Sequence, residues 1–125
     1  MIKEKTKELH QSVRPYTKPD NRKSYLQLLN TFLPLVIVWL LSYFALSISV
    51  WLTICLSIVG AGFLVRTFII FHDCTHGSFF HDKKKNDLLG TITGVITLFP
   101  YEKWKREHAI HHASSSNLDK RGVGD

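Results

Sequence analysis

Residues 32–50 read FLPLVIVWLLSYFALSISV, a run of nineteen residues without a charged side chain. About 20 apolar residues in a helix cross a hydrocarbon core of roughly 30 Å. This run is therefore long enough to cross a bilayer, and we expect it to form a first transmembrane helix.

The next stretch, residues 51–71, is also apolar and reads WLTICLSIVGAGFLVRTFIIF. It contains two glycines, Gly60 and Gly62, and one charged residue, Arg66. Its length predicts a second transmembrane helix. Because the two runs follow each other with few polar residues between them, we expect a helical hairpin.

The chain carries a formal net charge of +6, and its basic residues flank the apolar block on both sides. They do not form a stripe interleaved with exposed aromatic residues, so we expect no nucleic-acid partner. The apolar block has no Lys or Arg near the junction of the two runs. Because basic flanks remain in the cytoplasm, we expect a multi-pass protein of the cell membrane with both termini cytoplasmic.

The remaining segments are expected to lie at the membrane surface. Residues 1–24 form a charged amino-terminal segment, and Ser24 is a plausible cap for an interfacial turn over residues 25–30. Residues 88–100 are too few for a span, so they predict an interfacial or re-entrant helix, and residues 101–113 resume a helical pattern. The predicted fold is all-α and integral to the membrane: a transmembrane hairpin with cytoplasmic interfacial helices that carry histidines.

Five of the seven histidines fall into two clusters with helical spacing. His72 and His76 stand four apart, so a helix presents them on one face about 6 Å apart. His108, His111 and His112 repeat this arrangement with spacings of three and four. Five imidazoles exceed the needs of one tetrahedral zinc ion, so we expect two metal ions. Imidazole ligands suit iron, copper or zinc, and the ligands alone do not choose between them.

The other polar candidates have weaker cases. Asp73 can hydrogen-bond a ligand imidazole, or be hydrated at the helix end. Arg66 shares a helical face with Asp73, which predicts either a buried contact between them or an Arg66 side chain that reaches the interface. His81 lies outside both clusters and His10 lies in the charged tail, so neither is an expected ligand. Cys55 and Cys74 make neither a disulfide framework nor a thiolate zinc site.

Two motifs carry a resemblance to a known family. The stretch HDCTHGSFF at 72–80 resembles the first histidine box of membrane fatty acid desaturases, and HAIHH at 108–112 resembles the second. The segments LLNTF, AGF, FIIFHDC, TGVITLFPY and HHASSSNLDKRGVGD are similar to bacterial acyl-lipid desaturases of the Δ5 type. The resemblance covers residues 25–125, which we therefore expect to be a partial desaturase domain, with spans at about 32–50 and 51–71.

The resemblance implies a non-haem di-iron site that uses dioxygen and two electrons to place a double bond in a phospholipid acyl chain. It implies that His72, His76, His108, His111 and His112 are iron ligands, and that a ferredoxin or flavodoxin donates electrons. Family members continue to a third histidine box, so we expect this chain to be a part that is inactive alone. The alternatives are a di-iron hydroxylase or ketolase, and a non-catalytic metal-binding membrane protein.

Overall fold

The computed structural model describes residues 5, 8–9, 12–13 and 18–114. The described part of the chain contains the four helices named below, and no strand occurs in it. The helices are α2 (Asn21–Ala45), α3 (Val50–Thr75), α4 (Lys83–Thr97) and α5 (Tyr101–Ser114). The prediction of an all-α fold is confirmed.

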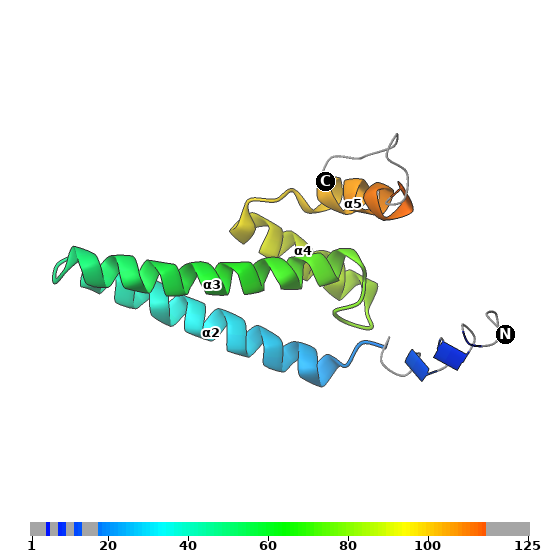
Figure 1. Cartoon of the computed structure of the whole chain (residues 1–125), viewed down its shortest axis with the longest axis horizontal. Coiled ribbons are helices and arrows are strands. Elements are labelled where there is room, and N and C mark those ends of the chain that lie inside the picture. The colour runs from blue at the N-terminus through cyan, green and yellow to red at the C-terminus, as the bar shows by residue number, and fades with distance from the viewer. Residues whose placement is uncertain (1–4, 6–7, 10–11, 14–17, 115–125) are drawn as a thin grey trace.

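The two longest helices, α2 and α3, run antiparallel as a hairpin (Figure 1). Both are long and apolar enough to cross a membrane, and only 17% and 22% of their most apolar windows are buried inside the protein. The outward faces are instead rich in exposed Leu, Ile, Val, Phe and Trp side chains. Such a hairpin is adapted to surroundings of low polarity, since an apolar face in water is unfavourable.

The start of α2 differs from the expected position. Asp20, not Ser24, is the N-cap, because its carboxylate accepts hydrogen bonds from the backbone amides of Arg22 and Lys23. Ser24 is buried inside the helix, and its hydroxyl donates to the carbonyl oxygens of Asp20 and Phe79. The hairpin turn spans residues 46–49, and α3 begins at Val50 because the Ser49 hydroxyl caps it.

One polar contact joins the two long helices. Arg66 donates from Nε to the hydroxyl oxygen of Thr31 at 3.3 Å, and Thr31 is fully buried. No ion pair between Arg66 and Asp73 occurs among the described residues. The predicted Arg66–Asp73 contact is therefore wrong, because the guanidinium turns toward α2 and finds an acceptor there.

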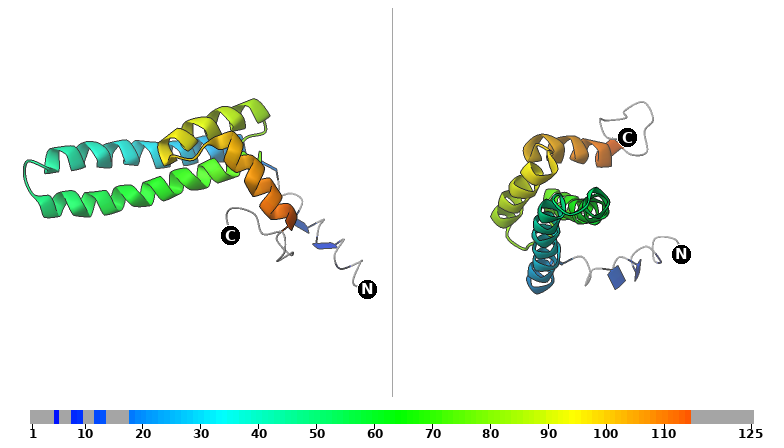
Figure 2. Two further views of the ribbon diagram at one scale, coloured as in Figure 1. Left: turned by 90° about the horizontal axis from the view of Figure 1, so that it is seen from above. Right: turned by 90° about the vertical axis from the view of Figure 1, so that its left-hand side faces the viewer.

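The two shorter helices lie against one half of the hairpin. Figures 1 and 2 show α4 alongside the second half of α3, with α5 turned away from the hairpin axis. Helix α4 begins with Asp82 as its N-cap and ends at Leu98, which adopts a left-handed conformation with φ 64°. It therefore begins before residue 88, where the interfacial helix was expected, because Asp82 accepts a hydrogen bond from the amide of Lys84.

A small core forms where the helices meet. It consists of Ile70, Phe71, Cys74, Phe79, Phe80 and Tyr101, with Phe68, Leu89 and Trp104 among the residues packed around it. The connecting loop before α4 is held by Asn86, whose buried amide pairs with both the amide and the carbonyl of Phe80. This core fixes the end of α3 relative to α4 and α5, and the clustered histidines lie beside it.

Candidate metal site

The first histidine pair stands at the carboxyl end of α3. His72 lies in its last turn and His76 is its C-cap, with their Nε2 atoms 3.3 Å apart. Gly77 ends the helix with φ +67°, a conformation that favours glycine. Its amide donates to the carbonyl of Cys74, and the amide of Ser78 donates to that of Asp73, which is a Schellman motif. Gly77 therefore terminates α3 directly after the first histidine pair.

The second pair comes from α5. His108 and His112 are one turn apart, with their Nε2 atoms separated by 3.0 Å. The Nε2 atom of His108 also lies 3.2 Å from that of His76, which joins the two pairs. As a result, one ligand nitrogen from each of His72, His76, His108 and His112 lies within 4.8 Å of all the others.

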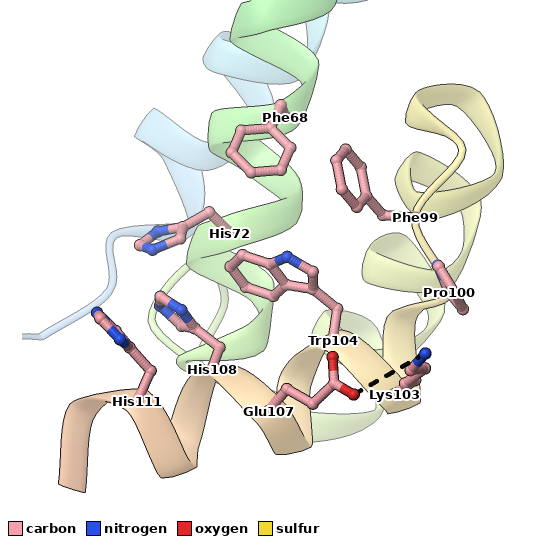
Figure 3. Close-up of a pocket in the computed structure, with 9 residues that line it drawn as sticks. All are labelled: Phe68, His72, Phe99, Pro100, Lys103, Trp104, Glu107, His108 and His111. Atoms are coloured by element: carbon pink, nitrogen blue, oxygen red, sulfur yellow. Dashed lines mark ion pairs between the residues drawn. The ribbon is translucent and has the colours of Figure 1, made fainter. Parts of the chain in front are cut away.

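His111 is close to this group without being part of it. Its ring lies 6.0 Å from the His108 ring in a stacked arrangement, and it lines the cavity beside the cluster (Figure 3). His111 is the fifth predicted ligand, and the structure therefore separates it from the four that converge.

The remaining predicted polar residues lie at the edge of the cluster or away from it. An Asp73 carboxylate oxygen is 3.7 Å from Nδ1 of His72, near the imidazole but beyond hydrogen-bond distance. The exposed His81 side chain is absent from the four-histidine group. His10 lies outside the described residues.

The electrostatic surroundings favour neutral imidazoles. Partial burial, and after it the neighbouring histidines, lower the pKa of His108 to about 4. The pKa of His76 is also lowered, first by burial and then by His72 and His112. A neutral imidazole keeps the lone pair that a metal ion requires, so these two side chains are ready to bind a cation at neutral pH.

Three of the six distances among the four nitrogens are close to those expected around one tetrahedral metal ion. Nitrogen ligands about 2.0–2.1 Å from a tetrahedral ion lie roughly 3.3–3.4 Å from one another. The observed neighbouring separations are 3.0, 3.2 and 3.3 Å. The donor set is all imidazole, which suits iron, copper or zinc better than magnesium or calcium.

Trp104 has a part in the site that we did not predict from the sequence. Its ring stacks on His108 with centroids 4.2 Å apart and an interplanar angle of 21°. It also meets Phe71 edge to face at 5.1 Å. The signal was its position four residues before His108, which puts both on one face of α5. Trp104 thus connects the core to a clustered histidine.

A largely apolar cavity of about 620 Å³ opens beside the histidines (Figure 3). Phe68 and His72 reach it from α3, and Phe99 from the link after α4. Helix α5 contributes Lys103, Trp104, Glu107, His108 and His111. Phe68 and Phe99 also line a second apolar cavity of about 340 Å³, together with Leu64, Val65 and Ile96. The two cavities thus share Phe68 and Phe99 as lining residues, and the second lies further along α3.

Comparison with known proteins is consistent with this arrangement. The family model described as Fatty acid desaturase matches residues 49–122. A Bacillus subtilis protein named Fatty acid desaturase is 53% identical over 124 residues, which cover 99% of this chain and 35% of that protein. An Anabaena variabilis protein named sn-1 oleoyl-lipid 12-desaturase is 33% identical over 102 residues, covering 81% of this chain and 28% of that protein.

A protein from Synechocystis is similar to a shorter segment of the chain. This protein, named sn-1 acyl-lipid omega-3 desaturase (ferredoxin), is 40% identical over 52 residues, or 42% of this chain and 14% of the relative. The chain thus spans about a third of the length of its Bacillus relative and less of the other two. No solved structure matches it significantly.

Proposed function

The chain belongs to the fatty acid desaturase family, and from this premise we propose that it is part of an enzyme that introduces a double bond into the acyl chains of membrane phospholipids. The observation that carries the proposal is the convergence of four imidazoles from two separate segments. They lie beside an apolar cavity large enough for a stretch of hydrocarbon chain. A metal site and a hydrocarbon site are thus adjacent, as oxidation of a methylene chain requires.

In this proposal the ligands are His72, His76, His108, His111 and His112, and the metal is iron. The four clustered nitrogens are close enough together to hold one ion, so a second iron needs further donors, of which His111 is one. Asp73, 3.7 Å from Nδ1 of His72, would have to move closer to hydrogen-bond that ring and hold Nε2 toward the metal. Bound iron would supply the chemistry in which dioxygen, two electrons and two protons remove two hydrogens from the acyl chain and yield two water molecules.

The residues of this chain would bind the substrate and exclude water from it. Phe68, Phe99 and Trp104 offer aromatic surfaces to the acyl chain beside His72 and His108. The second apolar cavity continues toward Leu64 and Val65 on α3, a helix long and apolar enough to cross a membrane. An acyl chain could therefore reach the histidines from the bilayer while its headgroup remained at the surface.

We further propose that the basic flanks lie on the cytoplasmic side of the cell membrane and that only the link at residues 46–49 faces outward. That link has no Lys or Arg, whereas exposed basic residues follow α3. Lys83, Lys84, Lys85, Lys103 and Arg106 are candidates to receive an acidic ferredoxin or flavodoxin. Attraction to anionic lipid headgroups would use the same charges.

A chimera tests the function. This chain would replace the matching segment of the Bacillus subtilis relative, in a host that lacks desaturase activity, and lipids would be analysed by mass spectrometry. We expect new double bonds in phospholipid acyl chains, and none when His108→Ala is added. Oxygenated acyl chains would indicate a hydroxylase or ketolase instead. Bound metal without any oxygen-dependent product would indicate a non-catalytic metal-binding protein.

A further inference from the structure

Helix α5 carries two of the four clustered histidines, yet little of it is buried. Tyr101, its first residue, is the one buried residue in α5, with 4% of its surface exposed. His108 and His112 lie two and three turns further along the helix. The direction of α5, and with it the position of these two imidazoles, therefore depends strongly on how its first turns are attached.

The hydroxyl of Tyr101 attaches this first turn to two other helices. It lies 3.0 Å from the carbonyl oxygen of Cys74, in the last turn of α3 between the two histidines of the first box. It also lies 3.0 Å from a carboxylate oxygen of Asp87 on α4. The single hydroxyl proton is shared between these two acceptors. Burial, and then the hydrogen bond to Asp87, raise the pKa of Tyr101, so the hydroxyl stays protonated at neutral pH.

Lys105 makes a second attachment one turn later. Its ammonium donates to the same carboxylate oxygen of Asp87 at 2.6 Å, and about a third of each side chain is exposed. The hydrogen bond from Lys105 is the main cause that lowers the pKa of Asp87, with that from Tyr101 contributing. Asp87 is thus a carboxylate at neutral pH, and one of its oxygens accepts hydrogen bonds from two side chains of α5.

We propose that Asp87 is a positioning residue that sets the separation of the two histidine pairs through Tyr101 and Lys105. Asp87 lies in neither histidine box, but it ties α5 to α4 directly and to the first box through the shared hydroxyl. Tyr101 and His108 are seven residues apart, so they share a helix face and lie about 10 Å apart along the axis. A small rotation of the first turn would therefore be magnified at the imidazoles.

A metal site tolerates only small errors in its ligand distances, so the attachment of α5 through Asp87 matters. Metal sites hold their ligand distances to within about 0.2 Å, and neighbouring Nε2 atoms in the cluster are 3.0–3.3 Å apart. Partners outside the immediate ligand set commonly change metal affinity by about 10- to 100-fold when they are removed. The inference rests on the proposed metal site, and it adds to it a residue that holds the ligands in place without touching the metal.

The first test measures geometry without metal. Spin labels would be placed at the exposed Val65 on α3 and Ile110 on α5, in the full chain in nanodiscs with Cys55 and Cys74 replaced by Ser. We expect Lys105→Met and Tyr101→Phe to broaden the distance distribution measured by pulsed electron paramagnetic resonance. Tyr101→Phe keeps the ring and removes only the hydroxyl, so it remains informative if a substitution at Asp87 prevents folding.

The matched control is Lys103→Met. Lys103 is on the same helix and carries the same charge, but its ion pair, 3.9 Å from Glu107, stays within α5. We expect this variant to keep the parent distribution, with unchanged helicity by circular dichroism in all variants. Distributions for Lys105→Met and Tyr101→Phe that equal that of Lys103→Met would overturn the proposal.

The second test measures cobalt(II) binding by visible absorption, which reports the coordination geometry. We expect the dissociation constant to rise by about tenfold or more in Lys105→Met relative to Lys103→Met. Asp87→Asn, which keeps an oxygen for Tyr101, should fall between Asp87→Ala and the parent. Equal affinities in Lys105→Met and Lys103→Met would also overturn the proposal. If the parent chain bound no cobalt(II), the proposed metal site would fail, and the distance measurement would still decide the role of Asp87.

Discussion

The Nε2 atoms of His76 and His108 lie 3.2 Å apart although 32 positions separate the two residues in the sequence. This contact joins the end of α3 to α5 and brings two histidine pairs into one cluster. Each pair alone is a common consequence of helical spacing. Their approach to each other is what distinguishes this cluster from two unrelated surface pairs.

Removal of a clustered histidine should weaken metal binding strongly. We expect His108→Ala to lower the affinity of the chain for cobalt(II) by more than about tenfold, since even residues outside the ligand set have effects of that size. His81→Ala is the control, because His81 is exposed and absent from the four-histidine group, and its effect should stay within about twofold. Equal cobalt(II) affinities of the two variants would contradict the assignment of the four histidines as a metal site.

His111 should behave differently in two assays. Since it lies outside the four converging nitrogens, His111→Ala should leave the affinity of the chain for a first metal ion within about twofold of the parent. In the chimera with the Bacillus relative, the same substitution should abolish desaturation, because we propose His111 as a ligand for a second iron. Normal desaturation by that variant would remove His111 from the ligand set.

Trp104 should contribute substantially to stability. It packs against Phe71 and His108 while remaining partly exposed, so we expect Trp104→Ala to lower the free energy of unfolding by about 2 kcal/mol. Trp104→Phe should recover part of this loss. Trp51→Ala is the control, because Trp51 is 77% exposed. Denaturation in mixed micelles measures all three, and equal losses for Trp104→Ala and Trp51→Ala would count against this packing role.

The proposed orientation can be measured with single cysteines. In a background with Cys55 and Cys74 replaced by Ser, we expect Ser47→Cys, in the exposed link, to react with an impermeant maleimide outside intact cells. Ser12→Cys should react only after the cells are opened, because the basic amino-terminal segment would lie in the cytoplasm. Labelling of Ser12→Cys in intact cells would reverse the proposed orientation.

Acidification should loosen α5. The folded state lowers the pKa of Asp87 below its usual value of 3.8. The stabilisation from its bonds to Lys105 and Tyr101 is therefore complete above about pH 4 and is lost as the pH falls through the lowered pKa. Because His108, with a pKa of about 4, is protonated in the same pH range, the Asp87→Asn variant is needed to separate the two effects. We expect the unfolding free energy of the parent to lose more on acidification than that of Asp87→Asn, and parallel profiles would refute this.

The local features of the fold could be predicted from the sequence because they depend on residues close together in the chain. Uncharged runs of helical length predict the hairpin, and the spacing of four between His72 and His76 predicts a shared face. Gly77 after them predicts the helix end. Each of these depends on backbone geometry, which is the same wherever the helix is placed.

The features that depend on packing between helices could not be predicted in this way. Asp20 and Ser24 are both good capping residues, and the choice depended on Phe79, whose carbonyl accepts from Ser24. Arg66 bonds to Thr31 because α2 lies beside α3. The separation of His111 from the other ligands depends on the angle at which α5 crosses the end of α3, which residue spacing does not contain.

Gly90 and Tyr101 meet so closely that a Cβ at residue 90 would overlap the Tyr101 ring. A larger residue at 90 would displace the ring from its place beside Cys74 and Asp87, while a smaller residue at 101 would leave empty the space that glycine provides. During divergence, each position therefore limits the substitutions accepted at the other. The two should change as a pair, with a side chain gained at one position accompanied by volume lost at the other.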